Sequence, residues 1–301
     1  MNLKSSFFIF LALIFCGSKG YAQTLQEIEA ELAALQYKIG DAPTDQERVE
    51  ANETFRKTLI KAFGEEGVYD YPFSSLLKIG MLPSGDGAFK LFTWNLPKTD
   101  GTYTYCAFLV FPDGKDYTEL IDSEDLTMED ESKTFTDKNW YGALYYHIQP
   151  VKEKGDTYYT LLGWDGNNKL SNMKIIDALE IDKRRKVEFG KPVFTTENGI
   201  RNRQIFEYAK NAQMMLSYIP AKDAIVYQVL AAISGAVEGN RAYYGPSSAH
   251  NALRLNKGIW LLEEETDMTQ PKSDPNKAQF NFPSRPDLNR QRDGKNPLTG
   301  K

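Results

Sequence analysis

Apolar residues recur at helical spacing between residues 23 and 64. The first half of this segment repeats them three and four positions apart, at Leu25, Ile28, Leu32, Leu35 and Ile39. The second half repeats them every four positions, at Ala51, Phe55, Leu59 and Phe63. Thr44 with Glu47 three residues later has the form of a capping box, which begins a helix. The pattern lasts barely two heptads, too short for a coiled coil, so residues 23–64 are predicted to form a helical hairpin.

From about Ala88 the apolar period changes from helical to two, which is typical of strands. Paired runs predict two hairpins, at 88–95 with 103–111 and at 141–151 with 157–164. Further strands are predicted at 173–181, 192–195, 204–209, 213–218, 224–229, 251–255 and 259–263. Because no helical pattern separates these short strands, they should pair antiparallel. Residues 65–265 are therefore expected to form a mainly β domain, an antiparallel meander of sandwich or propeller-like type, preceded by the helical hairpin.

Two segments depart from this alternation. Residues 116–132 hold eight acidic and no basic residues, which predicts a solvated loop or a ragged edge strand. Residues 266–301 are rich in Pro, Asn, Asp, Lys and Arg and contain few apolar anchors. We expect residues 266–301 to form a mobile tail.

The N-terminus has the pattern of a secretory signal peptide. Lys4 precedes an unbroken apolar run over 7–15, and Gly20 and Ala22 place small residues at −3 and −1 of a cut before Gln23. A lipoprotein signal acylated at Cys16 is the alternative, but it is disfavoured because the residue before it, Phe15, is large. Residues 1–22 are therefore predicted to be removed, which indicates a periplasmic or secreted protein. Gln228 and Ser234 interrupt the next apolar run, so we expect no membrane span.

Composition and charge narrow the classes of function. The formal net charge is −5 with a pI near 5.3, and no stripe of Lys and Arg alternates with aromatic residues. Nucleic-acid binding is therefore not expected. Aromatic residues make up 13% of the chain, which suits strands better than helices. Without the leader only Cys106 remains, so the fold must be stabilised by packing rather than by an internal disulfide.

The common catalytic motifs are absent from the sequence: G-x-S-x-G, H-E-x-x-H, the Walker loop and C-x-x-C. With only His147 and His250, a multi-histidine zinc site is excluded, and we expect no metal site and no cofactor. Residues 165–169 resemble the opening of a calcium loop, but Lys169 and Ile176 occupy ligand positions, so a type I′-like turn is predicted instead. Loose calcium binding by Asp122, Glu124 and Asp125 is an alternative to a simple solvated face.

Few side chains qualify as candidate site residues. Cys106 alternates with Phe108 and Val110, which favours a small core residue over a nucleophile. His250 follows a Gly-Pro-Ser-Ser segment and is assigned to a turn that leads into a strand. The binding candidates are Trp164 and Asp165, at the end of a predicted strand, and Tyr145 and His147, which share one face of the predicted strand 141–151.

Several segments resemble a group of uncharacterised exported proteins of Bacteroidetes-type bacteria. They are Trp140-Tyr-Gly-Ala-Leu-Tyr-Tyr146, Tyr158-Tyr-Thr-Leu-Leu-Gly-Trp-Asp-Gly-Asn167, Lys174-Ile-Ile176, Phe189-Gly-Lys-Pro-Val-Phe194 and Ile205-Phe-Glu-Tyr208. Asn256-Lys-Gly-Ile-Trp260 is similar to the group's closing Asn-Gly-Lys-Trp hairpin, with Lys and Gly exchanged and Ile inserted. The resemblance covers most of residues 65–265. It implies a Gram-negative periplasm or outer envelope and supplies no catalytic residue.

These observations favour an exported, non-catalytic binding or envelope-assembly protein, with an envelope protein or a glycan as its partner. The alternatives are a secreted hydrolase that uses Asp, Glu and Tyr side chains, and a carbohydrate-binding module. A hydrolase requires two acids that converge in a concave pocket, whereas a binding protein requires a cleft with aromatic residues and no such pair.

Overall fold

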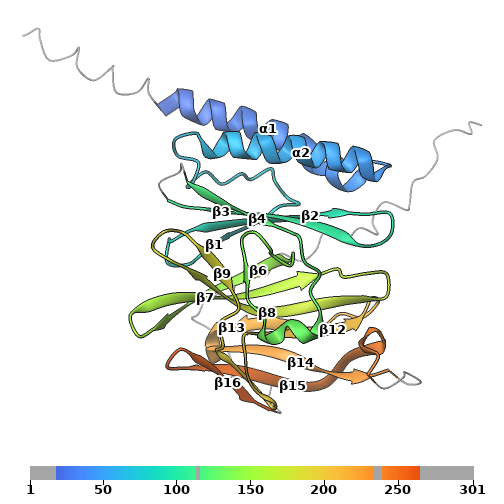
Figure 1. Ribbon diagram of the computed structural model, residues 1–301. Coiled ribbons are helices and arrows are strands. Elements are labelled where there is room, and N and C mark those ends of the chain that lie inside the picture. Colours follow the sequence, from blue (N-terminus) through green and yellow to red (C-terminus); the bar gives the residue numbers. More distant parts are fainter. Residues whose placement is uncertain (1–17, 113–115, 234–238, 265–301) are drawn as a thin grey trace, which may run out of the picture. The chain divides into compact units, whose positions relative to one another are not determined.

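The computed structural model describes residues 18–112, 116–233 and 239–264, with side chains from Leu25 onward. Helix α1 (Ser18–Asp41) and helix α2 (Asp45–Phe63) form the predicted hairpin (Figure 1). The capping box is confirmed, because Thr44 Oγ1 accepts from the Glu47 amide at 3.2 Å and Glu47 Oε2 accepts from the Thr44 amide at 3.2 Å. Most of the predicted leader, residues 1–17, lies outside the described residues. Its last residues, 18–22, lie in the first part of α1, where the glycine costs the helix only about 1 kcal/mol.

The strands confirm the expected mainly β, antiparallel architecture. The first sheet is a meander in the order β1-β2-β3-β4. Its strands are β1 (Gly80–Pro83), β2 (Lys90–Pro97), β3 (Tyr103–Val110) and β4 (Tyr117–Ile121). The predicted hairpin of residues 88–111 is therefore its centre, and the acidic segment 116–132 supplies β4 as an edge strand.

The second sheet has the order β5-β9-β8-β7-β6, with β12 also paired to β8. Its strands are β5 (Phe135–Thr136), β6 (Leu144–Glu153), β7 (Asp156–Asp165), β8 (Ser171–Ile181), β9 (Val187–Phe189) and β12 (Arg203–Ala209). The third sheet has the order β11-β10-β16-β15-β14-β13. Its strands are β10 (Phe194–Thr196), β11 (Gly199–Arg201), β13 (Leu216–Ile219), β14 (Ala224–Ala232), β15 (Tyr244–Asn256) and β16 (Ile259–Glu263). Between these named strands only β10 and β16 pair in parallel.

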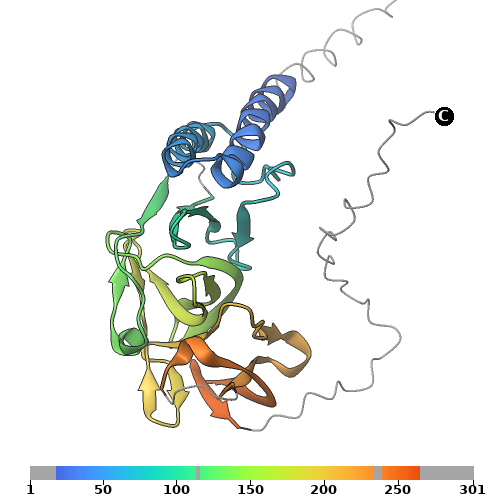
Figure 2. The same cartoon turned by 90° about the vertical axis from the view of Figure 1, so that its right-hand side faces the viewer.

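Three apolar clusters separate the layers, because the central strands are buried on both faces. On β2, Phe92 packs against the helices while Leu91 packs against the second sheet. On β7, Leu161 faces the first sheet while Leu162 faces the third. Helices, first sheet, second sheet and third sheet therefore stack in succession, and none of the sheets closes into a barrel (Figures 1 and 2).

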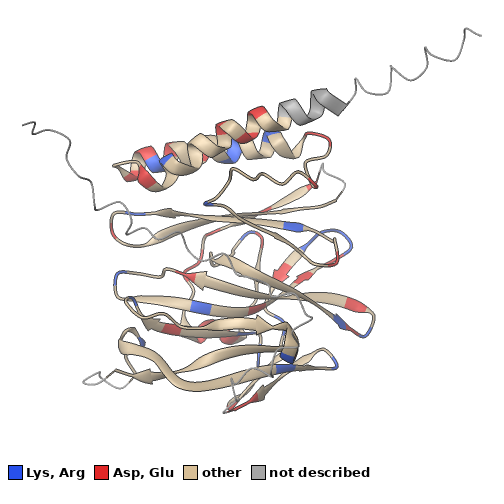
Figure 3. Cartoon of the chain, turned by 180° about the vertical axis from the view of Figure 1, so that it is seen from behind, with Lys and Arg blue, Asp and Glu red and all other residues tan. Residues whose placement is uncertain are grey.

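Charged residues are frequent on the helices and sparse along the strands (Figure 3). This distribution follows from burial, since the helices present one face to solvent whereas most strands lie between two layers. In the part of the chain that the structure describes, no helix is both long enough and apolar enough to cross a membrane.

Two turn predictions are wrong. Residues 245–250 belong to β15, where Pro246 pairs with β14 beside a register shift, while pairing with β16 begins only at Ala252. The link from β7 to β8 is a longer loop rather than a two-residue type I′ turn. Asp165 Oδ1 accepts from the Asn167 amide and Asn168 Oδ1 accepts from the Leu170 amide, so two successive side-chain turns shape it. The predicted mobile tail, 266–301, lies outside the described residues.

Candidate functional site

A cavity of about 730 Å³ opens at one end of the interface between the first and second sheets. We call it the acidic pocket, because its described lining holds six carboxylic side chains and Lys98 as the one cationic group. The acidic side chains are Asp122, Glu124, Asp125, Glu129, Asp165 and Glu207. Tyr103, Tyr105 and Tyr141 supply its aromatic surface.

Strand β3 brings two of these tyrosines to the pocket. Tyr103 and Tyr105 lie on the face of β3 that carries Ala107 and Leu109 into the cluster between the first and second sheets. Toward the strand's beginning, this cluster gives way to the pocket. The Tyr103 ring meets Trp164 edge to face, with 5.8 Å between ring centroids, and Trp164 thereby supports the pocket wall from behind.

Tyr105 connects two carboxyl groups of the pocket. Its backbone amide donates to Asp122 Oδ2 at 2.7 Å, and its hydroxyl donates to Asp165 Oδ1 at 2.7 Å. The same hydroxyl accepts from the Gly166 amide at 2.7 Å. Asp122 thus lies at the backbone end of this tyrosine and Asp165 at its hydroxyl end.

Gly142 makes this arrangement sterically accessible. Its φ of +75° favours glycine, and a Cβ there would lie 2.5 Å from the Tyr105 ring and 2.8 Å from Asp122 Oδ1. Any side chain at residue 142 would therefore displace the tyrosine or the carboxyl from the pocket.

Burial raises the pKa of both carboxyl groups. The pKa of Asp122 rises to about 6, mainly because burial disfavours the charged form and further because of the negative charge of Asp165. Burial also raises the pKa of Asp165, against the opposing hydrogen bonds from Tyr105 and Asn167. The pKa of the Tyr105 hydroxyl is raised strongly by burial and by Asp165, so this hydroxyl stays protonated and can donate. Asp122 is therefore protonated below about pH 6 and mostly charged above it.

Hydrogen bonds to β12, and to Lys210 just after it, fix the loop of residues 166–170 and Ser171, the first residue of β8. Ser171 Oγ donates to Glu207 Oε1 at 2.6 Å, and Lys210 Nζ donates to the Gly166 carbonyl at 2.7 Å. The Lys210 charge lowers the pKa of Asp165 and so offsets part of the effect of burial. These contacts hold the rim of the pocket without filling it.

A buried ion pair supports the pocket lining at the 3₁₀ turn of Met128–Ser132. Arg203 Nε donates to Asp177 Oδ2 at 2.9 Å, and both side chains are fully buried. Arg203 Nη1 also donates to the carbonyls of Asp130 and Lys133, which fixes the 3₁₀ turn of Met128–Ser132 at the edge of the acidic pocket. Tyr141, which lines the pocket, donates its hydroxyl to Asp177 Oδ2 at 2.7 Å. The wall and the tyrosine therefore depend on the same buried pair.

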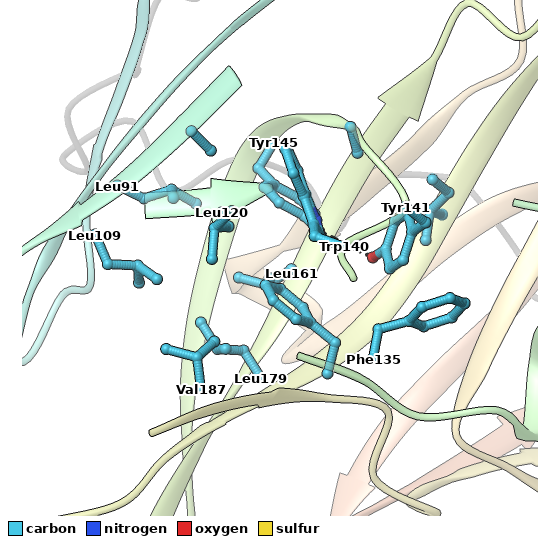
Figure 4. Packing of buried hydrophobic residues seen from close by; sticks show 14 of the residues in the cluster. Leu91, Leu109, Leu120, Phe135, Trp140, Tyr141, Tyr145, Leu161, Leu179 and Val187 are labelled. Carbon is cyan, nitrogen blue, oxygen red and sulfur yellow. Dashed lines mark hydrogen bonds between the residues drawn. The ribbon is translucent and has the colours of Figure 1, made fainter. Parts of the chain in front are cut away.

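The structure separates the four predicted site residues. Asp165 lines the acidic pocket, and Trp164 reaches it only through Tyr103. Tyr145 is a core residue whose hydroxyl contacts the Tyr141 hydroxyl at 2.9 Å and accepts from Trp140 Nε1 at 3.1 Å. Figure 4 shows Tyr145 beside Trp140 within the cluster between the first and second sheets.

His147 does not share a face with Tyr145, contrary to the prediction. A bulge at Tyr146 shifts the register, so that Tyr145 pairs with Gly163 but His147 pairs with Leu162. The extra residue turns His147 toward the third sheet, where its ring stacks on Tyr218 with centroids 5.0 Å apart. Burial lowers the pKa of His147, which favours its neutral form.

Cys106 lies where its alternation predicts, on the face of β3 that packs against the helices. Asn52 Nδ2 donates to its Sγ at 3.5 Å, and burial raises the pKa of the thiol to about 12. The thiolate, which is the reactive form, is therefore scarce at neutral pH.

Sequence reasoning missed Tyr103, Tyr105, Tyr141 and Glu207 as pocket residues. It named Asp122 only as a loose calcium ligand. The one usable signal was the alternation that puts Tyr103 and Tyr105 on one face. Within the described ranges, Asp122, Glu124 and Asp125 do not form a group of three side chains placed to hold a metal ion.

Comparison with known proteins identifies no relative: no family model, no curated protein and no solved structure matches this chain.

Proposed function

We propose that the chain is an exported protein that binds a glycan in the acidic pocket. The observation that carries this proposal is a cavity of about 730 Å³ that is lined by tyrosine side chains as well as by carboxyl groups. This volume lies within the usual range of small-ligand sites, roughly 300–1,000 Å³. Sugar hydroxyls donate hydrogen bonds to carboxylates, and the C–H faces of sugar rings pack on aromatic side chains.

The charge of the pocket restricts the ligand. Six carboxylic side chains against one lysine favour a ligand that donates hydrogen bonds or carries an ammonium group. A phosphorylated or otherwise anionic ligand would be repelled. We therefore expect a neutral glycan or one that carries amino groups.

Hydrolysis of the bound glycan is the second candidate, and one observation favours it. Asp122 and Asp165 line the same pocket, and the charge of Asp165 contributes to raising the pKa of Asp122 to about 6. A carboxyl whose pKa is raised toward neutrality beside a second carboxyl is the pattern of a general acid and its partner in glycosidases. Asp165 Oδ1, however, accepts hydrogen bonds from both the Tyr105 hydroxyl and the Asn167 amide, and the second of these also shapes the turn at Asn167. This dual use supports binding as the primary proposal.

Export is part of the proposal. Cleavage before Gln23 would leave Leu25 and Ile28, the first described buried side chains of α1, attached to the mature domain. Mass spectrometry of the protein from its host should find Gln23, or pyroglutamate there, at the N-terminus. An acylated Cys16 would contradict this assignment.

The binding proposal can be tested with a panel of oligosaccharides. The mature chain should bind at least one neutral or amino-bearing member, measured by calorimetry, and Glu207→Gln should weaken that binding at least about tenfold. Glu53→Gln is the matched control, because Glu53 lies on α2, outside the pocket lining. Equal binding by both variants, or no binding across the panel, would overturn the proposal. Chromatography of the incubated glycan decides between binding alone and hydrolysis.

A further inference from the structure

A second cavity, of about 220 Å³, lies where β12 meets the third sheet. We call it the edge cavity, because residues 205–207 line it and their strand, β12, pairs only with β8 among the described strands. Residues 227–230 of β14 form much of the rest of its lining. Met128 and Glu207 line both the edge cavity and the acidic pocket. The two cavities therefore adjoin at these two side chains.

Both side chains at this junction are held in place by buried or partly buried neighbours. Glu207 Oε1 accepts a hydrogen bond from Ser171 Oγ at 2.6 Å. Met128 begins the 3₁₀ turn that the buried Arg203 fixes through two backbone carbonyls. A ligand that passes from one cavity into the other would therefore contact a fixed carboxylate and an apolar thioether.

The backbone of β12 offers hydrogen-bonding groups along the same edge. In an antiparallel pair, the N–H and C=O groups of every second residue point away from the partner strand. The Ile205 amide points away from β8, because it donates to Glu131 Oε1 at 3.3 Å. The amide and carbonyl of Glu207, two residues further along, therefore point to the same side. They can bind hydroxyl groups of a ligand that lies along β12.

The edge cavity differs in its chemistry from the acidic pocket. The Phe206 ring is supported by Tyr227, with 4.7 Å between the ring centroids, and both residues line the cavity. Arg241 is the one cationic side chain of its described lining, against the carboxyl groups of Glu197 and Glu207. A guanidinium donates hydrogen bonds to hydroxyl and carbonyl oxygens and repels an ammonium group. The acidic pocket repels anions, so a ligand that occupies both cavities is best served by uncharged units.

We propose that the acidic pocket and the edge cavity together bind one linear glycan of neutral sugar units, so that the ligand is an extended chain rather than a free monosaccharide or disaccharide. This inference rests on the proposed function, because it extends the same site. One part of the bound chain fills the acidic pocket. The chain then crosses β12 at Glu207 and Met128. A further sugar unit packs on Phe206, and Arg241 donates to its oxygens.

Calorimetry on the mature chain tests this inference with two neutral series, the β-1,4-linked oligomers of glucose and of N-acetylglucosamine, each from dimer to hexamer. In at least one series the hexamer should bind at least about tenfold more tightly than the dimer. Arg241→Gln should remove that advantage and leave dimer binding unchanged. Because Arg241 is exposed, this variant should keep the melting temperature of the wild type. Arg254→Gln is the matched control, since Arg254 lies on β15 outside the lining of both cavities.

Hydrogen exchange supplies a second measurement that does not depend on a variant. The hexamer should slow exchange in residues 227–230, whereas the dimer should not. Equal affinity for dimer and hexamer, or equal weakening of both by Arg241→Gln, would overturn the inference and leave the glycan-binding proposal standing. Binding by neither series would also overturn it, while the wider oligosaccharide panel decides the glycan-binding proposal separately.

Discussion

Replacing Asp122 with asparagine should change how the stability of the protein depends on pH. The pKa of Asp122 is about 6 in the folded protein against an ordinary 3.8, so the folded state holds this proton more tightly than the unfolded chain. Asp122 therefore stabilises the fold fully below about pH 4, and this contribution is lost as pH rises toward 6. At higher pH the buried charge costs at most about 3 kcal/mol, and access of water to the partly exposed group reduces this to about 1–2 kcal/mol.

The amide of the substituted side chain would carry no charge, and its oxygen can still accept from the Tyr105 amide. Chemical denaturation should therefore find Asp122→Asn more stable than the wild type by about 1–2 kcal/mol at pH 8 and no more stable at pH 4. Glu53→Gln, on α2 and outside the pocket lining, is the matched control. A gain for Asp122→Asn of the same size at both pH values would refute the reasoning, because titration of this carboxyl would not then be its cause.

Two further substitutions test other parts of the structure. Asp177→Leu should cost about 3–5 kcal/mol of stability because it leaves Arg203 buried without a counter-charge, whereas Asp177→Leu with Arg203→Met should recover much of that loss. Hydrogen exchange in residues 128–133 should nevertheless stay faster in the double variant, since the carbonyls of Asp130 and Lys133 lose their donor; native protection there would contradict the positioning role of Arg203. Cys106→Ala should cost about 1 kcal/mol, and native Cys106 should resist thiol reagents until unfolding; rapid labelling of the folded protein would disprove its assignment as a structural residue.

The elements that could be predicted from the sequence are those with local signals. The apolar repeat from Leu25 to Ile39 and the capping box at Thr44 can each be recognised within a short stretch of sequence, and both are present as predicted. The long strands β2, β3, β7 and β8 carry continuous apolar runs because both of their faces are buried. Shorter strands such as β5 and β9 were missed, since they hold two or three residues whose pairing depends on the rest of the sheet.

The site was harder to predict because its geometry is non-local. A strand bulge is defined by the partner strand, so alternation along β6 placed His147 on the wrong face. Asp122 follows an acidic edge strand and has the pattern of a solvated residue. Its burial comes from Tyr105, on the neighbouring strand of the same sheet, and from Gly142, just before β6 of the second sheet. Asp165 was identified because a polar residue that ends an aromatic strand is a local signal.

The central claim is that a glycan occupies the acidic pocket, and a hydrogen-exchange footprint tests it most directly. The measurement compares the mature chain with and without a saturating oligosaccharide from the binding panel. The account predicts slower exchange in residues 103–105, 122–129 and 165–168, with no change in the helices. Protection confined to other segments, or no protection at saturation, would contradict it.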